Sequence, residues 1–175
     1  MVAALAVSEQ LAARDGGPRV SGEQFIEAFL VGFEVESKIA EAIHPDHYMK
    51  GFHSSGTIGT LGAAAAAAKL LGLDADKTAH ALAIAASSAA GIRVNFGTMT
   101  KPLHVGRAAQ NGVVAAELAA RGFTGGKDAL DPPWGFMQVF SHGGGFDADR
   151  IVGKLGNPHV IVWPGVSIKP YPCGV

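Results

Sequence analysis

The sequence predicts an all-α protein, a helical bundle with short β segments near its C-terminus. Apolar residues recur with helical spacing over most of the chain, and capping residues, glycines and prolines interrupt them at intervals typical of helix ends. Hydrophobic residues make up 48% of the 175 residues but aromatic residues only 7%, so much of the apolar content is alanine. This composition suits one domain of closely packed helices.

Local signals bound the expected helices. Ser21 followed by Gln24 forms a capping box, and His44-Pro45 ends the helix that starts there. Asp74 is a second N-cap candidate. The expected helices span residues 2–14, 21–44, 57–71, 74–90 and 104–121, with short helical turns at 127–130, 135–140 and 147–155.

The C-terminal part has a different pattern. β-Branched residues at 159–162 and 166–168 flank Trp163-Pro164-Gly165 and predict one or two short strands. We therefore expect a partial helical domain at residues 1–158 and a connector at residues 159–175. The chain stops without a closing helix, which indicates that sequence is missing.

Charge and composition exclude several classes of protein. Fourteen Lys and Arg against fifteen Asp and Glu give a net charge of −1, which offers no basic surface for nucleic acid. The single cysteine, Cys173, excludes an internal disulfide. The N-terminus lacks the basic region of a signal peptide, and the longest apolar stretch, residues 61–73, is too short to cross a bilayer. We expect a soluble, cytoplasmic protein with no membrane or nucleic-acid partner.

The segment at residues 51–57 combines His53 with the hydroxyls of Ser54 and Thr57 just before an expected helix. A helix N-terminus with unpaired N–H groups suits a carboxylate, and an imidazole can act there as acid or base. The alternative is structural: the hydroxyls cap the helix and His53 is a hydrogen-bonded loop residue.

Two lysines precede prolines in segments expected to be stiff. Lys101 lies in a loop ahead of the helix that begins at His104, and Lys169 lies two residues before Tyr171. Each lysine can hold a carboxylate, but Lys101 can also be a solvated lysine and the second segment a rigid connector. A metal site at His44 and His47 is not expected, because Pro45 breaks the helix that would present both.

Taken together, these motifs resemble the MmgE/PrpD family. The resemblance covers essentially the whole chain. It rests on Gly51-Phe52-His53, Gly56-Thr57-x-Gly59, Thr100-Lys101-Pro102-Leu103-His104-x-Gly106-x-Ala108 and Lys169-Pro170-Tyr171-Pro172-Cys173, in that order.

The resemblance implies the large helical domain of this family and a cofactor-independent lyase that acts on a small polycarboxylate, usually as a homodimer. It implies that His53 is catalytic and that Lys101 and Lys169 contact substrate carboxylates. His104 and Tyr171 match motif positions and are expected to bind substrate, as are Ser54 and Thr57 at the helix start. No metal and no organic cofactor are expected.

Within this family we expect a 2-methylcitrate dehydratase-like enzyme, with a decarboxylase or an epimerase as alternatives. Family members are more than twice this length. An upstream acidic and histidine-containing stretch and a downstream α+β lid are therefore expected to be missing, and the connector at 159–175 leads toward that lid. A further alternative is a truncated, non-catalytic helical module that associates with another chain.

Overall fold

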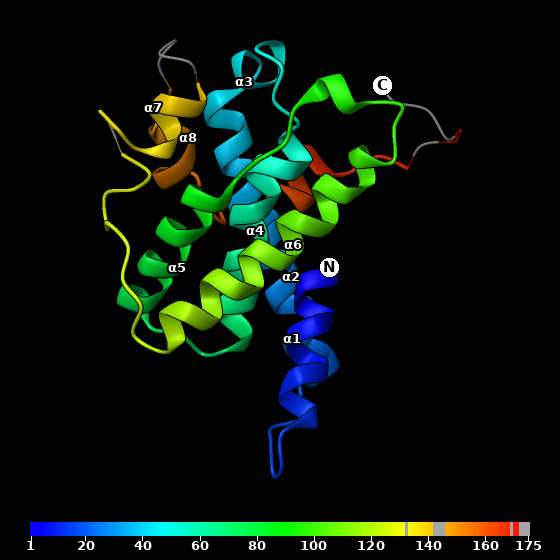
Figure 1. The fold of residues 1–175 in the computed structure, drawn as a ribbon, viewed down its shortest axis with the longest axis vertical. Coiled ribbons are helices and arrows are strands. Elements are labelled where there is room, and N and C mark those ends of the chain that lie inside the picture. The colour runs from blue at the N-terminus through cyan, green and yellow to red at the C-terminus, as the bar shows by residue number, and fades with distance from the viewer. Residues whose placement is uncertain (132, 142–145, 169, 172–175) are drawn as a thin grey trace.

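The computed structural model describes residues 1–131, 133–141, 146–168 and 170–171, and within them the chain is all-α, as predicted (Figure 1). The elements are α1 (Val2–Ala13), α2 (Gly22–Ile43), α3 (Asp46–Met49), α4 (Ser54–Leu70), α5 (Ala75–Ser88), the 3-10 turn η1 (Arg93–Asn95), α6 (Thr100–Ala120), α7 (Phe136–Phe140), α8 (Asp149–Val152) and the π-helical turn η2 (Ile161–Gly165).

The predicted N-caps are confirmed. The Ser21 hydroxyl accepts a hydrogen bond from the Gln24 N–H at 3.2 Å, and the Gln24 side chain accepts one from the Ser21 N–H at 2.8 Å. The Asp74 carboxylate accepts from the Lys77 N–H at 2.8 Å. These bonds satisfy N–H groups that the first turn of a helix leaves unpaired.

Two helices begin earlier than the sequence predicts. α4 starts at Ser54 rather than at residue 57, and α6 starts at Thr100 rather than at residue 104. Pro102 is tolerated inside α6 because its missing N–H belongs to the first turn, where N–H groups have no partner within the helix. Lys101 therefore lies in the first turn of α6 and not in a loop.

The predicted strands near the C-terminus are wrong. Residues 161–165 form η2, and residues 166–168 have no regular structure. A β-branched run becomes a strand only where another strand pairs with it, and none does in the described part of the chain. The β-bridge that the described residues form instead joins Phe52 to Ile92, far from this region.

α4 is the central helix, packed most extensively against α6 and α2 and also against α5 and α1 (Figure 1). Small residues allow these close crossings. A Cβ atom on Gly112 of α6 would lie 2.5 Å from the Ala63 Cβ, and one on Gly32 of α2 would lie 2.6 Å from the Gly62 carbonyl oxygen. The alanine content of the sequence is therefore used in helix-to-helix contact.

A buried carboxylate fixes the chain that follows α8. The Glu34 side chain, which is 5% exposed, accepts hydrogen bonds from the N–H groups of Gly156 at 2.9 Å and Val160 at 2.7 Å. The segment between α8 and η2 is thereby held on α2.

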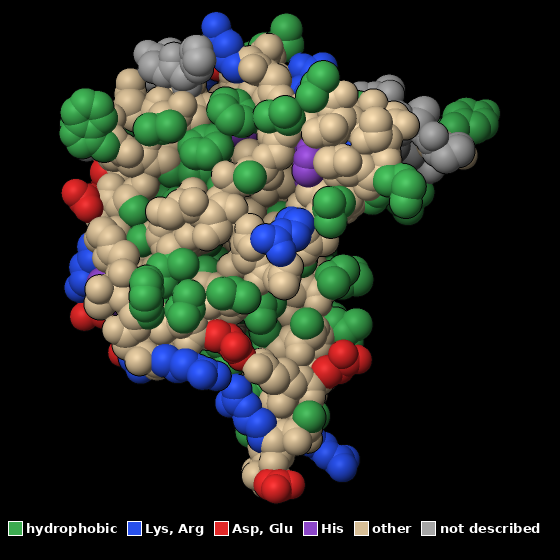
Figure 2. All heavy atoms as spheres, viewed as in Figure 1, with side chains coloured by type: hydrophobic (Ala, Val, Ile, Leu, Met, Phe, Trp, Pro, Cys, Tyr) green, Lys and Arg blue, Asp and Glu red, His purple; other side chains and the backbone are tan. Residues whose placement is uncertain are grey.

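No helix in the described ranges is both long enough and apolar enough to cross a membrane. On the face shown in Figure 2, acidic and basic side chains are interspersed, and apolar side chains form several separate patches.

Candidate active site

Backbone hydrogen bonds join the segment before α4 to the segment after α5. Phe52 and Ile92 form the antiparallel bridge. The Arg93 N–H donates to the Gly51 carbonyl at 2.8 Å, and the His53 N–H donates to the Gly91 carbonyl at 3.0 Å. The bridge and these two hydrogen bonds hold the start of α4 beside the segment that leads into α6.

His53 is the N-cap residue of α4, and its side chain is only 6% exposed. Its Nδ1 lies 3.0 Å from Nδ1 of His104, which is half-buried in α6. The edge of its ring contacts Phe96, with ring centroids 4.8 Å apart. The structure thus brings together two histidines that are 51 residues apart in the sequence.

The surroundings favour the neutral form of His53. Burial lowers the pKa of the imidazole, and the nearby His104 and Lys101 lower it further through charge repulsion. A neutral imidazole near neutral pH has one nitrogen that can accept a proton and one that can donate. His53 is therefore equipped for proton transfer.

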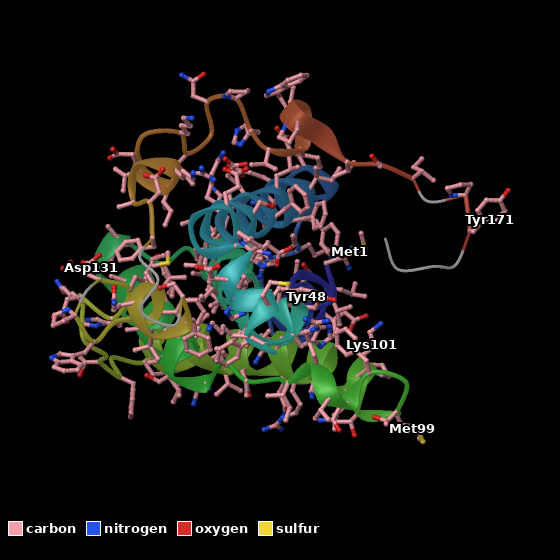
Figure 3. The ribbon with its side chains drawn as sticks, turned by 90° about the horizontal axis from the view of Figure 1, so that it is seen from above. Met1, Tyr48, Met99, Lys101, Asp131 and Tyr171 are labelled. Carbon is pink, nitrogen blue, oxygen red and sulfur yellow. The ribbon has the colours of Figure 1, made fainter. Side chains whose placement is uncertain are left out.

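Lys101 is exposed, and its Nζ lies 4.8 Å from the centroid of the Phe96 ring. Since His53 contacts the same ring, Phe96 connects the predicted base to the predicted carboxylate-binding lysine. Figure 3 shows Lys101 at the end of the molecule where α6 begins, on the side opposite to Asp131. The ammonium group is thus open to solvent and to a ligand.

The two hydroxyls predicted to bind substrate have different surroundings. The Ser54 Oγ lies 2.9 Å from Nε2 of His44 and faces a cavity of about 840 Å³ between α1, α2, α4 and α6. Thr57 is fully buried, and its Oγ1 lies 2.7 Å from Nε2 of His47. Ser54 is accessible to a ligand, whereas the Thr57 hydroxyl is used inside the protein.

The bonds of His47 define its protonation. Its Nδ1 lies 2.9 Å from the Phe140 carbonyl oxygen, which can only accept, so Nδ1 carries the proton. Nε2 therefore accepts from the Thr57 hydroxyl. Burial lowers the pKa of His47, and the charge of His44 lowers it further, against the opposing effect of the Phe140 bond. This buried pair holds α3 and α7 on the start of α4.

Lys169, predicted to contact a substrate carboxylate in the catalytic site, lies outside the described residues. Tyr171 is 73% exposed and stands apart from Lys101 (Figure 3). The structure therefore gathers His53, His104 and Lys101, and it does not bring Tyr171 to them.

Two features of this region were missed by the sequence prediction. Phe96 was not proposed as part of a site, and an aromatic residue in a loop gives no signal of such a role. Glu36 lies in the mainly apolar cavity that Ser54 also lines. Burial raises its pKa from 4.5 to about 6, although the nearby N-terminal amine lowers it. The helical pattern of α2 reveals no reason for a carboxyl group there.

No group of three or more His, Cys, Asp or Glu side chains in the described ranges is arranged to hold a metal ion. The ring nitrogens of His47 are both bonded within the protein, and His44 pairs with Ser54. Within the part of the chain that the structure describes, the site presents histidines for proton transfer and the ammonium group of Lys101.

The chain is similar in sequence to known proteins of one family. The model of the MmgE/PrpD N-terminal domain matches residues 1–149. The chain is 45% identical to a cis-aconitate decarboxylase of Homo sapiens over 126 residues, which are 71% of this chain and 26% of that protein. It is 35% identical to a cis-aconitate decarboxylase of Aspergillus terreus over an aligned length of 179 residues, and this alignment covers 98% of this chain and 36% of that protein. A cis-aconitate decarboxylase-like protein, oryM, of Aspergillus oryzae is 38% identical over 129 residues.

The chain thus spans between about a quarter and a third of the length of these relatives. The domain match covers most of the chain, and it includes both helix starts that carry His53 and Lys101. The chain therefore belongs to the MmgE/PrpD family.

Proposed function

We propose that these residues form the helical part of a carboxylate lyase that decarboxylates cis-aconitate or a closely similar tricarboxylate. The observation that carries the proposal is the grouping of a buried, neutral His53 and the exposed Lys101 around Phe96. The relatives named as cis-aconitate decarboxylases support decarboxylation over the dehydration of 2-methylcitrate, which we expected from the family resemblance and which the motifs do not distinguish from decarboxylation.

The proposed chemistry needs both side chains. Loss of CO2 leaves an electron pair beside the remaining carboxylates, and the pair must end as a C–H bond. An ammonium group at Lys101 opposes the build-up of negative charge. A charge pair at contact contributes about 4 kcal/mol at an effective dielectric of about 20, and less where water screens it. His53 supplies the proton to carbon.

Among the other predicted site residues, Ser54 enters the proposal with a role of its own. Ser54 lies beside the large cavity and is placed to meet a carboxylate. Substrate contacts of Lys169 and Tyr171 stay predictions of the family resemblance, since Lys169 lies outside the described residues and Tyr171 stands apart from Lys101. The proposal uses only side chains of the protein and no added cofactor. The homodimer implied by the resemblance is a further prediction, which light scattering tests.

The experiment measures CO2 release from cis-aconitate and water loss from 2-methylcitrate. Two proteins are compared: residues 1–175 alone, and a chimera in which they replace the matching part of the Aspergillus terreus enzyme. We expect the chimera to release CO2 and residues 1–175 to release little, because they match only 36% of that enzyme.

His53→Ala or Lys101→Ala in the chimera should reduce the rate by about 100-fold or more, as loss of a general acid or an oxyanion-type contact does. His80→Ala is the control, since His80 lies in α5 and bonds to the Gly125 carbonyl at 2.9 Å. Water loss from 2-methylcitrate without CO2 release would favour the dehydratase. A folded chimera without either activity would favour a non-catalytic helical module.

A further inference from the structure

His53 and His104 face each other across the starts of α4 and α6, with their Nδ1 atoms 3.0 Å apart. We propose that His104 is a positioning residue that shares one proton with His53 through this contact, and so sets whether His53 meets the substrate as a base or as an acid. The inference rests on the proposed function, in which His53 acts on the substrate. It assigns to His104 a role other than the substrate binding that the sequence predicts.

Two glycines lie beside this contact, and a Cβ atom at Gly56 would crowd His104. A Cβ atom on Gly91 would lie 3.4 Å from Cγ and Nδ1 of His104 and 3.5 Å from the Cβ of His53. A Cβ atom on Gly56 would lie 3.1 Å from the Cβ of His104 and 2.6 Å from the Ala90 carbonyl oxygen. Gly91 also has a φ of 143°, a conformation that favours glycine.

The fold also holds the rings in place. The His53 N–H is bonded to the Gly91 carbonyl, and Phe96 meets the His53 ring edge-on with centroids 4.8 Å apart. His53 is almost fully buried, so its ring is fixed by packing on one side and by His104 on the other.

Two nitrogens at 3.0 Å must share one proton, because an Nδ1–H needs a lone pair opposite it. When His53 carries the proton on Nδ1, its Nε2 has a free lone pair and is a base. When His104 carries the proton on Nδ1, Nδ1 of His53 accepts a hydrogen bond from it. Nε2 of the neutral His53 then carries a hydrogen, which it can donate as an acid. A change between these two states moves the shared Nδ1 proton, adds a proton at Nε2 of His53 and removes one at Nε2 of His104. The position of the shared proton is thereby coupled to whether Nε2 of His53 acts as a base or as an acid.

The charged groups around His53 and His104 allow the neutral pair to take up only one further proton. Lys101 lies in the same first turn of α6 as His104, and its charge acts on His53. Arg93 of η1 lies with its guanidinium carbon 6.0 Å from the Phe96 centroid. With these cations present, protonation of both rings places like charges in contact. Burial lowers the pKa of His53, so His53 does not hold the added proton in the proposed resting state.

The proposed step balances for decarboxylation. Before the reaction, His104 carries protons on both nitrogens and His53 carries one on Nε2. The C–C bond to the departing carboxylate breaks, CO2 leaves, and the remaining electron pair takes the Nε2 proton of His53 to form C–H. The Nδ1 proton of His104 moves to Nδ1 of His53. Both rings end neutral. A proton from water at Nε2 of His53, together with return of the shared proton from Nδ1 of His53 to Nδ1 of His104, restores the first state.

The first test is nuclear magnetic resonance of residues 1–175 with nitrogen-15 in the histidine rings, whose shifts distinguish protonated from unprotonated nitrogens. In the neutral pair, we expect one Nδ1 to carry a proton and the other to carry none. Two protonated or two unprotonated Nδ1 atoms would overturn the proposal without any variant.

The second test compares three variants by the same spectra, with circular dichroism to check folding. His104→Ala should raise the titration midpoint of His53, because a cationic neighbour and a covering ring are removed together. His104→Asn keeps a hydrogen-bond partner and should restore much of the buried ring environment. His80→Ala should leave the His53 signals unchanged. An unaltered His53 midpoint in a folded His104→Ala protein would overturn the shared proton.

Kinetic measurements distinguish a positioning role of His104 from a purely structural one. In the chimera, His104→Asn should lower kcat about tenfold or more, with KM for cis-aconitate nearly unchanged. It should also shift the limb of the kcat–pH profile that reports the pKa of the general acid, His53. A raised KM with unchanged kcat would show substrate binding by His104 instead. Absence of CO2 release from the parent chimera would contradict the proposed function alone, because the spectra of the pair need no turnover.

Discussion

Replacement of Gly112 by alanine tests whether backbone contact between α6 and α4 holds this fold together. A Cβ atom at this position would lie 2.5 Å from the Ala63 Cβ, 2.6 Å from the Ala64 nitrogen and 2.8 Å from the Ala63 carbonyl carbon. Two of these atoms belong to the backbone of α4 and cannot rotate away. The helices must separate for the variant to fold.

Two opposing effects set the size of the change. Overpacking of a core typically costs about 1–3 kcal/mol, and the rigid backbone here places Gly112→Ala at the upper end. Alanine in place of glycine inside a helix gains about 1 kcal/mol. The free energy of unfolding should therefore fall by about 2 kcal/mol, which lowers Tm by roughly 4–8 °C in a domain of this size.

Gly106 provides the matched control on the same helix. No heavy atom lies within 4 Å of a Cβ built there, so Gly106→Ala should stabilise the protein by up to about 1 kcal/mol. Urea unfolding followed by far-ultraviolet circular dichroism compares both variants with the parent protein. If Gly112→Ala matched or exceeded the parent in stability, the close crossing of α4 and α6 would be disproved.

The remaining predictions concern α2 and its cap. Burial raises the pKa of Glu36 from 4.5 to about 6, so the free energy of unfolding should fall by about 2 kcal/mol in total as pH rises from well below 4.5 to well above 6. Glu36→Gln should remove this loss, which urea unfolding at several pH values measures. Burial raises the pKa of Glu34, but the N–H groups of Gly156 and Val160 outweigh it, so its stabilisation is lost as pH falls. Glu34→Ala should cost about 2 kcal/mol or more and speed hydrogen exchange at both amides. Ser21→Ala should cost about 1 kcal/mol in urea unfolding, and no change would argue against the cap.

The helices were predictable because their signals are local. Ser21 and Asp74 cap helices through bonds to residues three positions further on, and these bonds form as the sequence indicates. The starts of α4 and α6 were less predictable, because the glycine and serine at α4 and the proline at α6 are typical of loops as well as of first helical turns. The strands after residue 158 were predicted from side-chain type alone, and pairing cannot be inferred from type.

The candidate site was predicted only in part, because its contacts join distant segments. Motif resemblance picked out His53 and Lys101, but no spacing in the sequence shows that both contact Phe96. The 3.0 Å approach of His53 to His104 depends on the packing of α4 against α6. The burial of Thr57 against His47 likewise follows from the position of α3 and not from the motif that contains Thr57.

The composition of α4 has a consequence for how the site is held. The buried run from Ala64 to Ala68 has side chains without rotamers, so burial freezes no side-chain conformation and costs no rotational entropy there. The same residues offer no alternative packing, because a methyl group cannot swing into a new position. The orientation of α4 is therefore set by the shapes of the neighbouring backbones. We therefore expect the first turn of α4, which follows His53, to shift only together with the rest of the helix.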